Sequence, residues 1–303
     1  MEKVKPIKLS EGQTIKDLVS QMKHAGFGAR KIGLASEIVN KMFSDSECKV
    51  FFGLAGAMVP AGMKQIVIDL IRGKKIDVLV TTGANLTHDL AEALGEEHYH
   101  CDEWDDDKLH ELGYDRMFNV LMKNEVYIKL ENFFEKNWEK LNKAGTIKEF
   151  LYLAGSVLAE EKVVNDSILM ACYENDVKLF CPALANSGIG LMIWGRKVAG
   201  KNIEIDAFED MKEIIDLAWT SKKSGVVYVC GGEPKNFIQQ SLQFSKGADY
   251  GVQITTDTPA GGGSSGAPLE EGKSWGKLKK EATFVDVCCD ATIAMPLIFG
   301  SLK

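Results

Sequence analysis

The chain has 303 residues, 45% of them hydrophobic and 26% charged, so it can bury the core of one extended α/β domain. Its net charge of -7 argues against a general binder of nucleic acid or anionic membranes and fits a cationic partner. The charged start MEKVKPIKLS lacks the apolar centre of a signal peptide, and no segment has about eighteen uninterrupted apolar residues, so we expect a soluble cytoplasmic protein.

Apolar and β-branched runs alternate with helix-period stretches along most of the chain. Two helices are predicted first, at 14–24 and 30–43. The alternation that follows is typical of an α/β fold with a doubly wound, mostly parallel sheet. The predicted strands are 49–54, 76–82, 177–181, 225–230, 250–255 and 284–289, and the helices that follow strands are 60–72, 87–94, 188–198, 235–245 and 291–302.

Residues 124–160 interrupt this alternation with amphipathic helical sequence. Four aromatic residues there have spacings that favour core or subunit packing over a ligand site: Phe133, Phe134, Trp138 and Phe150. We expect one domain over 1–303, with an N-terminal helical segment, 1–47, before the α/β core. The seven cysteines are odd in number and form no Cys-x-x-Cys, which indicates reduced thiols.

Ligands of open parallel sheets bind where strands end and helices begin. Small residues at such ends let backbone N–H groups approach a phosphate or a flat ring, so a dinucleotide is the natural ligand. The alternative is that these glycines only allow helices to pack, because no Gly-x-Gly-x-x-Gly follows the first strand. Asp290 could bind a ribose hydroxyl, cap the next helix, or do both. The candidate loops are 53–57, 81–85, 184–188, 230–232, 255–257 and 290–291.

The segment Ser274-Trp275-Gly276-Lys277 follows the glycine-rich loop 261–266 and offers an amine nucleophile in a defined place. A lysine amine attacks a carbon centre only when it is unprotonated, and a buried position favours that form. Such a lysine would suit imine chemistry. The alternative is a solvated surface run, because Lys273, Lys279 and Lys280 lie beside it.

The run SWGKLKKEATFVDVCCDATIAMPLIFGSL at 274–302, with GGE at 231–233 and KGADYGVQI at 246–254, resembles the deoxyhypusine synthase family. The similarity continues through 76–90 and FCPAL at 180–184, and so extends over roughly 49–302. In that family the lysine of a Ser-Trp-Gly-Lys motif is the nucleophile, which implies Lys277 here. The resemblance also implies amine binding by Glu271, Trp275, His88, Gly231, Asn236 and Ser264, and a Rossmann-like NAD site formed by Gly56, Ala57, Thr82, Gly83, Ala84, Asn186, Thr256, Asp257, Asp290 and Ala291.

The resemblance implies an NAD-dependent transferase that moves the 4-aminobutyl group of the polyamine spermidine through a lysine imine. In deoxyhypusine synthase the acceptor is a lysine of initiation factor 5A, and in homospermidine synthase relatives it is putrescine. The family's active sites lie between the subunits of a homotetramer, so we expect the same assembly here.

The sequence differs from the family where that family places polar anchors for its amine. Loss of two hydrogen bonds to charged groups, each worth about 1.5–3 kcal/mol, would weaken polyamine binding by about two orders of magnitude or more. A polyamine synthase with a small amine acceptor therefore remains an alternative to deoxyhypusine synthase. The differing positions are Thr87, His88, Leu191, Asn236, Gly261 and Ser264, with Gly56-Ala57 in place of a Ser-Asn pair.

Two further classes stay open. A family member that binds NAD or a protein without catalysis would explain the missing acids. A metal-dependent hydrolase is the other, although the spacing of its candidate ligands matches no strong metal signature, so we predict no metal. Those candidate ligands are His88, His98, His100, Cys101, Asp102 and His110.

Overall fold

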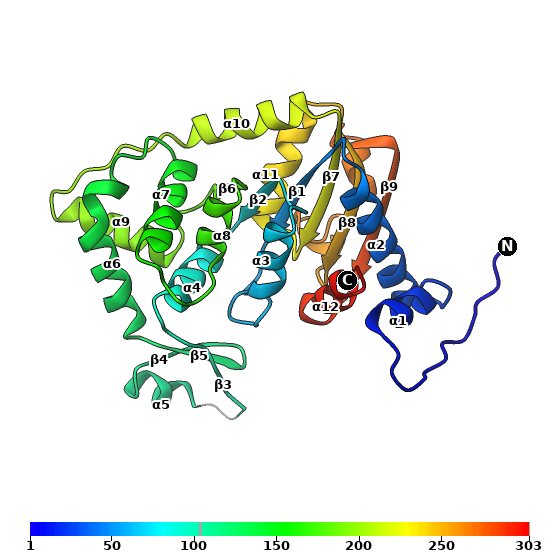
Figure 1. The fold of residues 1–303 in the computed structure, drawn as a ribbon, viewed down its shortest axis with the longest axis horizontal. Coiled ribbons are helices and arrows are strands. Elements are labelled where there is room, and N and C mark those ends of the chain that lie inside the picture. The colour runs from blue at the N-terminus through cyan, green and yellow to red at the C-terminus, as the bar shows by residue number, and fades with distance from the viewer. Residues whose placement is uncertain (103–104, 303) are drawn as a thin grey trace. The chain divides into compact units, whose positions relative to one another are not determined.

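The computed structural model describes residues 1–102 and 105–302 (Figure 1). The chain forms two compact units. We call residues 1–55, 75–80 and 211–303 the sheet unit, and residues 56–74 and 81–210 the helical unit. No disulfide joins the seven cysteines in the part of the chain that the structure describes. Within the described ranges, no helix is both long enough and apolar enough to cross a bilayer.

The main sheet has six strands in the order β6-β2-β1-β7-β8-β9, which confirms the predicted α/β class. β1, β7, β8 and β9 are parallel neighbours (Figure 1). Their buried β-branched and aromatic residues explain why the sequence formed strands here. The strands are β1 (Cys48–Leu54), β2 (Val78–Thr81), β6 (Lys178–Phe180), β7 (Lys223–Val229), β8 (Ala248–Thr255) and β9 (Leu278–Cys288).

Two strand glycines reveal which helices cover the two faces of the sheet. A Cβ at Gly53 would lie 3.3 Å from Ile238, whereas a Cβ at Gly225 would lie 2.5 Å from Met42. Gly53 pairs with Tyr228, and residues 225 and 228 of one strand point to opposite faces. Helices α11 (Gly232–Gln243) and α2 (Phe27–Ser44) therefore cover opposite faces, as doubly wound folds require.

The remaining helices of the sheet unit contact α2 or follow the strands. α1 begins with a capping box in which Thr14 and Asp17 exchange hydrogen bonds, and it packs on α2. α12 also packs on α2. The bounds are α1 (Ile15–Met22), α10 (Ala207–Thr220, which begins in the helical unit), α12 (Ala291–Gly300) and the 3-10 turns η1 (Pro259–Gly261) and η2 (Leu269–Lys273).

The helical unit holds seven α-helices among its described residues and a small antiparallel sheet with the order β3-β5-β4. The small sheet was missed by the sequence analysis, because its strands are short and only partly buried. The helices are α3 (Lys64–Arg72), α4 (Gly83–Ala93), α5 (Asp106–Glu111), α6 (Val126–Leu141), α7 (Ile147–Glu160), α8 (Ile168–Glu174) and α9 (Gly188–Val198), and the strands are β3 (Tyr99–His100), β4 (Tyr114–Met117) and β5 (Val120–Lys123).

Two predicted helix starts differ from the structure by four residues: α4 begins at Gly83 rather than at 87, and α3 begins later than predicted. Pro60 was expected to lie in the first turn of a helix over 60–72, but α3 begins only at Lys64. Gly62 has φ +79°, a left-handed conformation that ends any right-handed helix begun at Pro60. Residues 58–62 form turns instead.

The aromatic residues of the insertion form core, as predicted. Phe134 and Phe150 are fully buried, and their rings stack at 5.9 Å between α6 and α7. Phe133 lies edge-on to Phe134, and Trp138 is 5% exposed. Helix α7 in turn packs on α8, where Gly155 allows the two backbones to approach.

We predict that Gly155→Ala destabilises the protein. A Cβ at Gly155 would lie 2.4 Å from the Leu169 carbonyl oxygen, so the helices must separate, at a cost of about 1–3 kcal/mol in the free energy of unfolding. Gly195→Ala in α9 is the matched control, because its Cβ meets no atom within 4 Å and helix propensity should add up to about 1 kcal/mol. Urea denaturation measures both, and equal effects of the two substitutions would contradict this packing.

Candidate functional site

The Ser-Trp-Gly-Lys segment forms a tight turn between η2 and β9. Gly276 has φ +71°, a conformation that a residue with a side chain rarely adopts, and this explains the glycine of the motif. The Lys277 backbone N–H donates to the Gly272 carbonyl at 2.8 Å, and the Lys277 carbonyl accepts from Ala248 N at 3.1 Å. Both backbone groups of Lys277 are therefore fixed.

The amine of Lys277 differs from those of the neighbouring lysines. Lys273 pairs with Glu270, Lys279 pairs with Asp249, and Lys280 is exposed. Lys277 is half-buried, and its Nζ lies 4.9 Å from the centre of the Trp275 ring. Among the described residues it has no ion-pair or hydrogen-bond partner.

Trp275 is 55% exposed, so it flanks the amine rather than enclosing it. A buried position was expected for Lys277, and its half-burial meets this expectation only in part. Half-burial without an acidic partner still leaves the Lys277 amine free to react.

A buried lysine, Lys235 of α11, lies beneath this segment. Its Nζ donates to the carbonyl oxygens of Ser264 and Ala267, both at 2.6 Å, and the residue is 1% exposed. Gln253 of β8 donates to the same Ala267 carbonyl at 3.0 Å. Burial lowers the pKa of Lys235 to about 8, although the carboxylates of Asp286 and Glu271 pull it upward.

Asp286 of β9 holds Leu269, the first residue of η2, in place. Its carboxylate accepts from the Leu269 backbone N–H at 3.1 Å. Burial raises the pKa of Asp286, while this hydrogen bond and the charge of Lys235 oppose the rise. Gln253 and Asp286 are register partners, so they lie on one face of the sheet, the face covered by α11.

Sequence reasoning missed Lys235, Gln253 and Asp286. Two of them carried a signal, because Gln253 and Asp286 are polar residues inside otherwise apolar strands. Buried polar groups in such places are hydrogen-bonded, and their partners can be sought in a covering loop. Nothing in the local sequence distinguishes Lys235 from a surface lysine of a helix.

The other predicted amine-binding residues of the sheet unit lie around the same loop. Ser264 donates to the Gly232 carbonyl at 3.2 Å, and a Cβ at Gly231 would lie 2.7 Å from Ser265. Asn236 follows Lys235 and is half-buried, and Glu271 lies exposed in η2. The structure therefore brings Gly231 together with Ser264, and places Glu271 near Lys235.

Three predicted cofactor positions share the carboxyl edge of the sheet. Thr255 pairs with Cys288, so Thr256 and Asp257 lie close to the end of β9, where Asp290 precedes α12. Asp290 caps α12, because its Oδ1 accepts from the N–H and the hydroxyl of Thr292, both at 2.7 Å. Its other oxygen forms no hydrogen bond with the described residues. Ala291 is the first residue of α12 and is buried.

This edge fits a dinucleotide. The exposed carboxylate of Asp290 retains an acceptor for a ribose hydroxyl while it caps α12, so both sequence interpretations of the residue are compatible. The helix N-termini add little to this fit, because the Gly232 N–H of α11 donates to Ser265 Oγ at 3.0 Å and the Thr292 N–H of α12 donates to Asp290 at 2.7 Å.

Lys277 and Asp290 lie at opposite ends of one strand. Lys277 immediately precedes β9, whereas Asp290 follows its end. The lysine and the cofactor edge are thus not brought together within the sheet unit.

The predicted cofactor residues of the helical unit cluster at two helix starts. Thr82 caps α4 by accepting from Asn85 N at 3.3 Å. A Cβ at Gly83 would lie 2.5 Å from the Ser187 side chain, so the loop that carries Asn186 packs against Gly83, whereas Ala84 is exposed. The two remaining positions, Gly56 and Ala57, lie in the turn after β1, where Gly56 has φ +70°.

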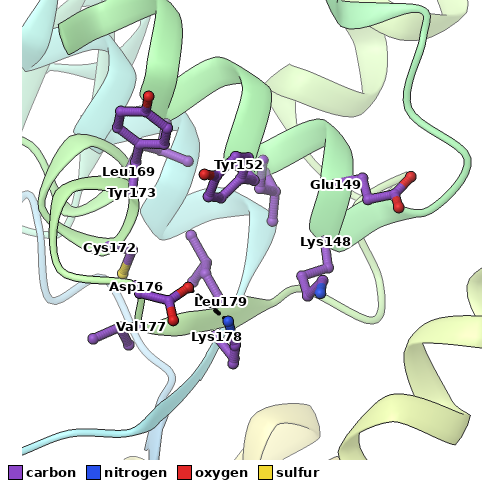
Figure 2. A pocket seen from close by; sticks show the side chains of 11 residues that line it. Lys148, Glu149, Tyr152, Leu169, Cys172, Tyr173, Asp176, Val177, Lys178 and Leu179 are labelled. Atoms are coloured by element: carbon purple, nitrogen blue, oxygen red, sulfur yellow. Dashed lines mark hydrogen bonds and ion pairs between the residues drawn. The ribbon is translucent and has the colours of Figure 1, made fainter.

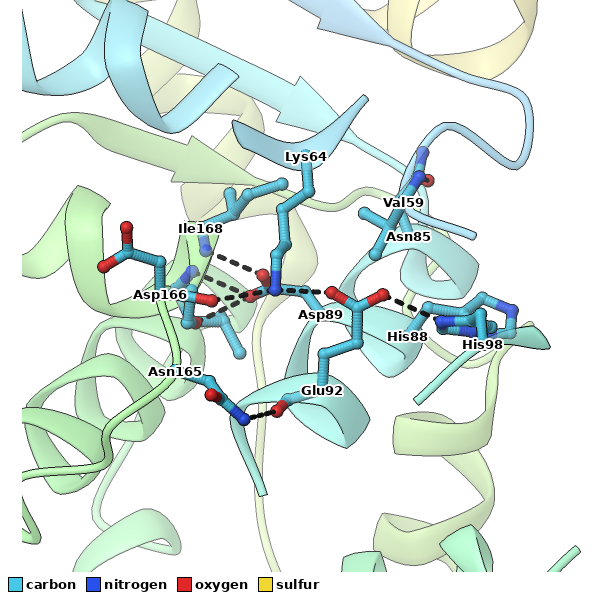
Figure 3. Close-up of polar contacts among 12 residues, drawn as sticks. Val59, Lys64, Asn85, His88, Asp89, Glu92, His98, Asn165, Asp166 and Ile168 are labelled. Carbon is cyan, nitrogen blue, oxygen red and sulfur yellow. Dashed lines mark hydrogen bonds and ion pairs between the residues drawn. The ribbon is translucent and has the colours of Figure 1, made fainter. Parts of the chain in front are cut away.

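Thr87, one of the positions that differs from the family, is structural. It is 5% exposed, and its hydroxyl donates to the Gly83 carbonyl and accepts from Ile189 N. His88, the next residue, joins a polar cluster with His98 and Glu92 (Figure 3). Within residues 1–102 and 105–302, no three His, Cys, Asp or Glu side chains are placed to hold a metal ion.

A separate cavity of about 290 Å³ lies between α7, α8 and β6 (Figure 2). Tyr152 and Tyr173 pack edge to face at 4.9 Å beside it, and Lys178 pairs with Asp176 there. None of the residues that line it was predicted to bind substrate or cofactor.

Comparison with known proteins identifies the family. A model of the deoxyhypusine synthase family matches residues 17–302. The chain belongs to the deoxyhypusine synthase family. Probable deoxyhypusine synthase 1 of Archaeoglobus fulgidus is 40% identical, over 97% of this chain and 95% of its own length. Probable deoxyhypusine synthase 2 of Methanosarcina acetivorans is 38% identical, over 96% and 87%.

The fold of the deoxyhypusine synthase family is also seen in solved structures. A crystal structure from Entamoeba histolytica assigned to a deoxyhypusine synthase matches with a TM-score of 0.65 at 19% identity, and covers 96% of this chain and 93% of its own. AgrE, crystallised with ornithine and NAD+, matches with a TM-score of 0.59 at 12% identity, over 91% of this chain and 34% of its own. Both likenesses concern the fold alone.

We predict that Lys235→Met loosens the segment that carries Lys277. The substitution keeps the length of the side chain but removes the Lys235 donor from the Ser264 carbonyl, at a cost of about 1–3 kcal/mol for an unpaired acceptor, and leaves the Ala267 carbonyl with its hydrogen bond from Gln253. Hydrogen exchange of residues 258–277 should become faster. Lys246→Met, at an exposed position of the same unit, is the control, and equal exchange in both variants would show that Lys235 does not hold the loop.

Proposed function

We propose that the chain is an NAD-dependent aminoalkyl transferase that acts through an imine on Lys277. The assignment we favour is deoxyhypusine synthase itself, which moves the 4-aminobutyl group of spermidine to a lysine of the initiation factor 5A precursor. Family membership supports the transferase class. The observation that carries the mechanism is the half-buried Lys277 amine, which no acidic side chain among the described residues neutralises.

Lys277 carries the covalent step of the proposed reaction, and NAD would carry the hydride transfers. Bound NAD would accept a hydride from spermidine and later return it to the product. The neutral Lys277 amine attacks the imine carbon of the oxidised donor, expels the diaminopropane fragment and keeps the aminobutyl group as its own imine. The acceptor amine then attacks that carbon and releases Lys277. Asp290, Thr256 and Asp257 would hold the cofactor.

A polyamine synthase with a small amine acceptor is the second candidate. Two residues favour this candidate, because they occupy positions where the family carries polar groups that bind its amine. Leu191 is apolar, and the Thr87 hydroxyl is used in packing α4 against α9. Mass spectrometry of products formed from NAD and spermidine, with either the factor 5A precursor or putrescine as acceptor, separates the two. Absence of any transfer would favour a non-catalytic homologue.

We predict that borohydride traps an aminobutyl adduct on Lys277 when NAD and spermidine are present. Lys277→Arg keeps the positive charge but removes the primary amine that forms an imine, so adduct and transfer should both disappear while NAD binding persists. Peptide mapping locates the adduct, and Lys273→Arg, four residues away in the chain, is the control. Transfer that survives Lys277→Arg at a near wild-type rate would defeat the covalent mechanism.

We also propose that the protein assembles as a homotetramer. Leu191, Trp194 and Val198 lie on one side of α9 at helical spacing, and each is 55–68% exposed. Trp194 and Val198 line an apolar groove of about 540 Å³. A second copy that covers this surface would bury it, and assembly could also join Lys277 of one chain to the cofactor edge of another.

Trp194→Glu should therefore dissociate the tetramer, because it would place a charge in a buried apolar contact. Light scattering coupled to gel filtration measures the mass. Val164→Glu is the matched control at an isolated site, 97% exposed, and should leave the mass unchanged. A wild-type protein that is monomeric, or a Trp194→Glu variant of wild-type mass, would contradict this role of α9.

A further inference from the structure

The cavity between α7, α8 and β6 lies beside a close contact of the two helices (Figure 2). At Gly155 a Cβ would lie 2.4 Å from the Leu169 carbonyl oxygen and 3.0 Å from Tyr173 Cβ. Nearer the start of α7 the side chains no longer fill the space, and a cavity of about 290 Å³ remains. All of its lining residues belong to the helical unit.

The floor of the cavity is apolar and uncharged. Five of the lining side chains are only 1–8% exposed: Leu151, Leu169, Cys172, Val177 and Leu179. Burial raises the pKa of the Cys172 thiol, so this side chain stays uncharged as well. Water at such a floor finds few hydrogen-bond partners, so an apolar ligand that displaces this water gains free energy.

One wall of the cavity consists of two aromatic rings. Tyr152 and Tyr173 pack edge to face, with ring centres 4.9 Å apart and ring planes at 65°. Contact with Gly155 holds Tyr173 in place, whereas Tyr152 is 50% exposed and leaves part of its ring uncovered. Neither hydroxyl forms a hydrogen bond with a described residue. The wall can therefore pack against a further flat ring and offer it a hydrogen bond.

The rim of the cavity carries no net charge, because Lys148 and Lys178 are matched in number by Glu149 and Asp176. Lys178 Nζ pairs with Asp176 at 2.6 Å, and Glu149 accepts from the Gly145 N–H at 2.8 Å. Figure 2 shows the Glu149 carboxylate directed away from the other labelled side chains. A charged ligand would have to compete with these contacts, whereas an uncharged ligand would not.

We infer that this cavity binds an uncharged aromatic molecule of two fused rings. An apolar cavity of about 150 Å³ can hold one benzene ring, and this cavity of about 290 Å³ is about twice as large. The floor supplies apolar contact, the tyrosine wall supplies a ring partner, and the neutral rim gives no preference for an ion. None of the residues assigned to amine or NAD binding lines the cavity, so this ligand is separate from the proposed reaction.

Quinoline and its N-methyl cation test the inference, because the two probes share one ring system and differ by one charge at neutral pH. Methyl spectra of protein labelled at leucine and valine report on the floor of the cavity. Quinoline should shift the signals of Leu151, Leu169 and Leu179 saturably, with a dissociation constant of about 1 mM or tighter. N-methylquinolinium should bind about tenfold more weakly, because it loses hydration without gaining an acidic partner.

Tyr152→Ala removes the exposed ring of the aromatic wall and should weaken quinoline binding by about tenfold or more. Tyr99→Ala, at an exposed tyrosine of β3 in the same unit, is the matched control and should leave binding unchanged. The inference is overturned if the floor signals show no saturable shift, if Tyr152→Ala binds quinoline as tightly as the wild type, or if the two probes bind equally. The comparison of the two probes uses the wild type, so it remains decisive even if Tyr152→Ala does not fold.

Quinoline should also raise the temperature of thermal unfolding, because a ligand of the folded cavity stabilises the folded state by mass action. An unfolding temperature that stays constant at saturating quinoline would contradict binding in this cavity. Borohydride trapping on Lys277 is a separate measurement. If the adduct forms and quinoline does not bind, only this inference is wrong, and if quinoline binds and no adduct forms, only the proposed function is wrong.

Discussion

The candidate site depends on one buried ammonium group. Lys235 is 1% exposed, and its Nζ holds the carbonyl groups of Ser264 and Ala267. A buried charge is tolerated only where polar groups surround it, so the loop that leads to Lys277 cannot leave α11 without taking from Lys235 the two carbonyl oxygens that accept its hydrogen bonds. Asp286 adds an opposite charge nearby and binds the Leu269 N–H. The glycine of the lysine turn then sets the direction of the Lys277 backbone.

The sequence predicted the regular part of the fold well, because buried parallel strands leave unambiguous apolar runs. α9 was predicted at its observed bounds, 188–198, and most strands to within two residues. β9 was the exception, since it begins six residues before the predicted strand, with charged Lys279 and Lys280 near its start. Pairing in β9 is irregular near that point, which an alternation pattern does not predict. The small sheet was not predicted, because its partly exposed strands lack a clear alternation of apolar and polar residues.

For the site, motif resemblance located Lys277 and the strand-end loops but not the groups that hold them. Lys235 lies 29 to 32 residues from the carbonyl groups it binds, and only the packing of α11 on the sheet joins them. Thr87 and His88 are adjacent in sequence, yet one is buried between α4 and α9 and the other reaches a charge cluster. Adjacent residues of a helix point in different directions, and the sequence alone does not specify which contacts each will make.

Lys277 and His88 are held in place by different sets of residues in this chain. Lys277 is fixed by contacts within the sheet unit, through η2, α11 and β9. His88 is fixed by contacts within the helical unit, through Glu92 and His98. Because the two sets share no residue, a substitution at His88 should leave the support of Lys277 intact. A chain of this family can therefore keep the covalent chemistry proposed for Lys277 and still differ from its relatives in substrate.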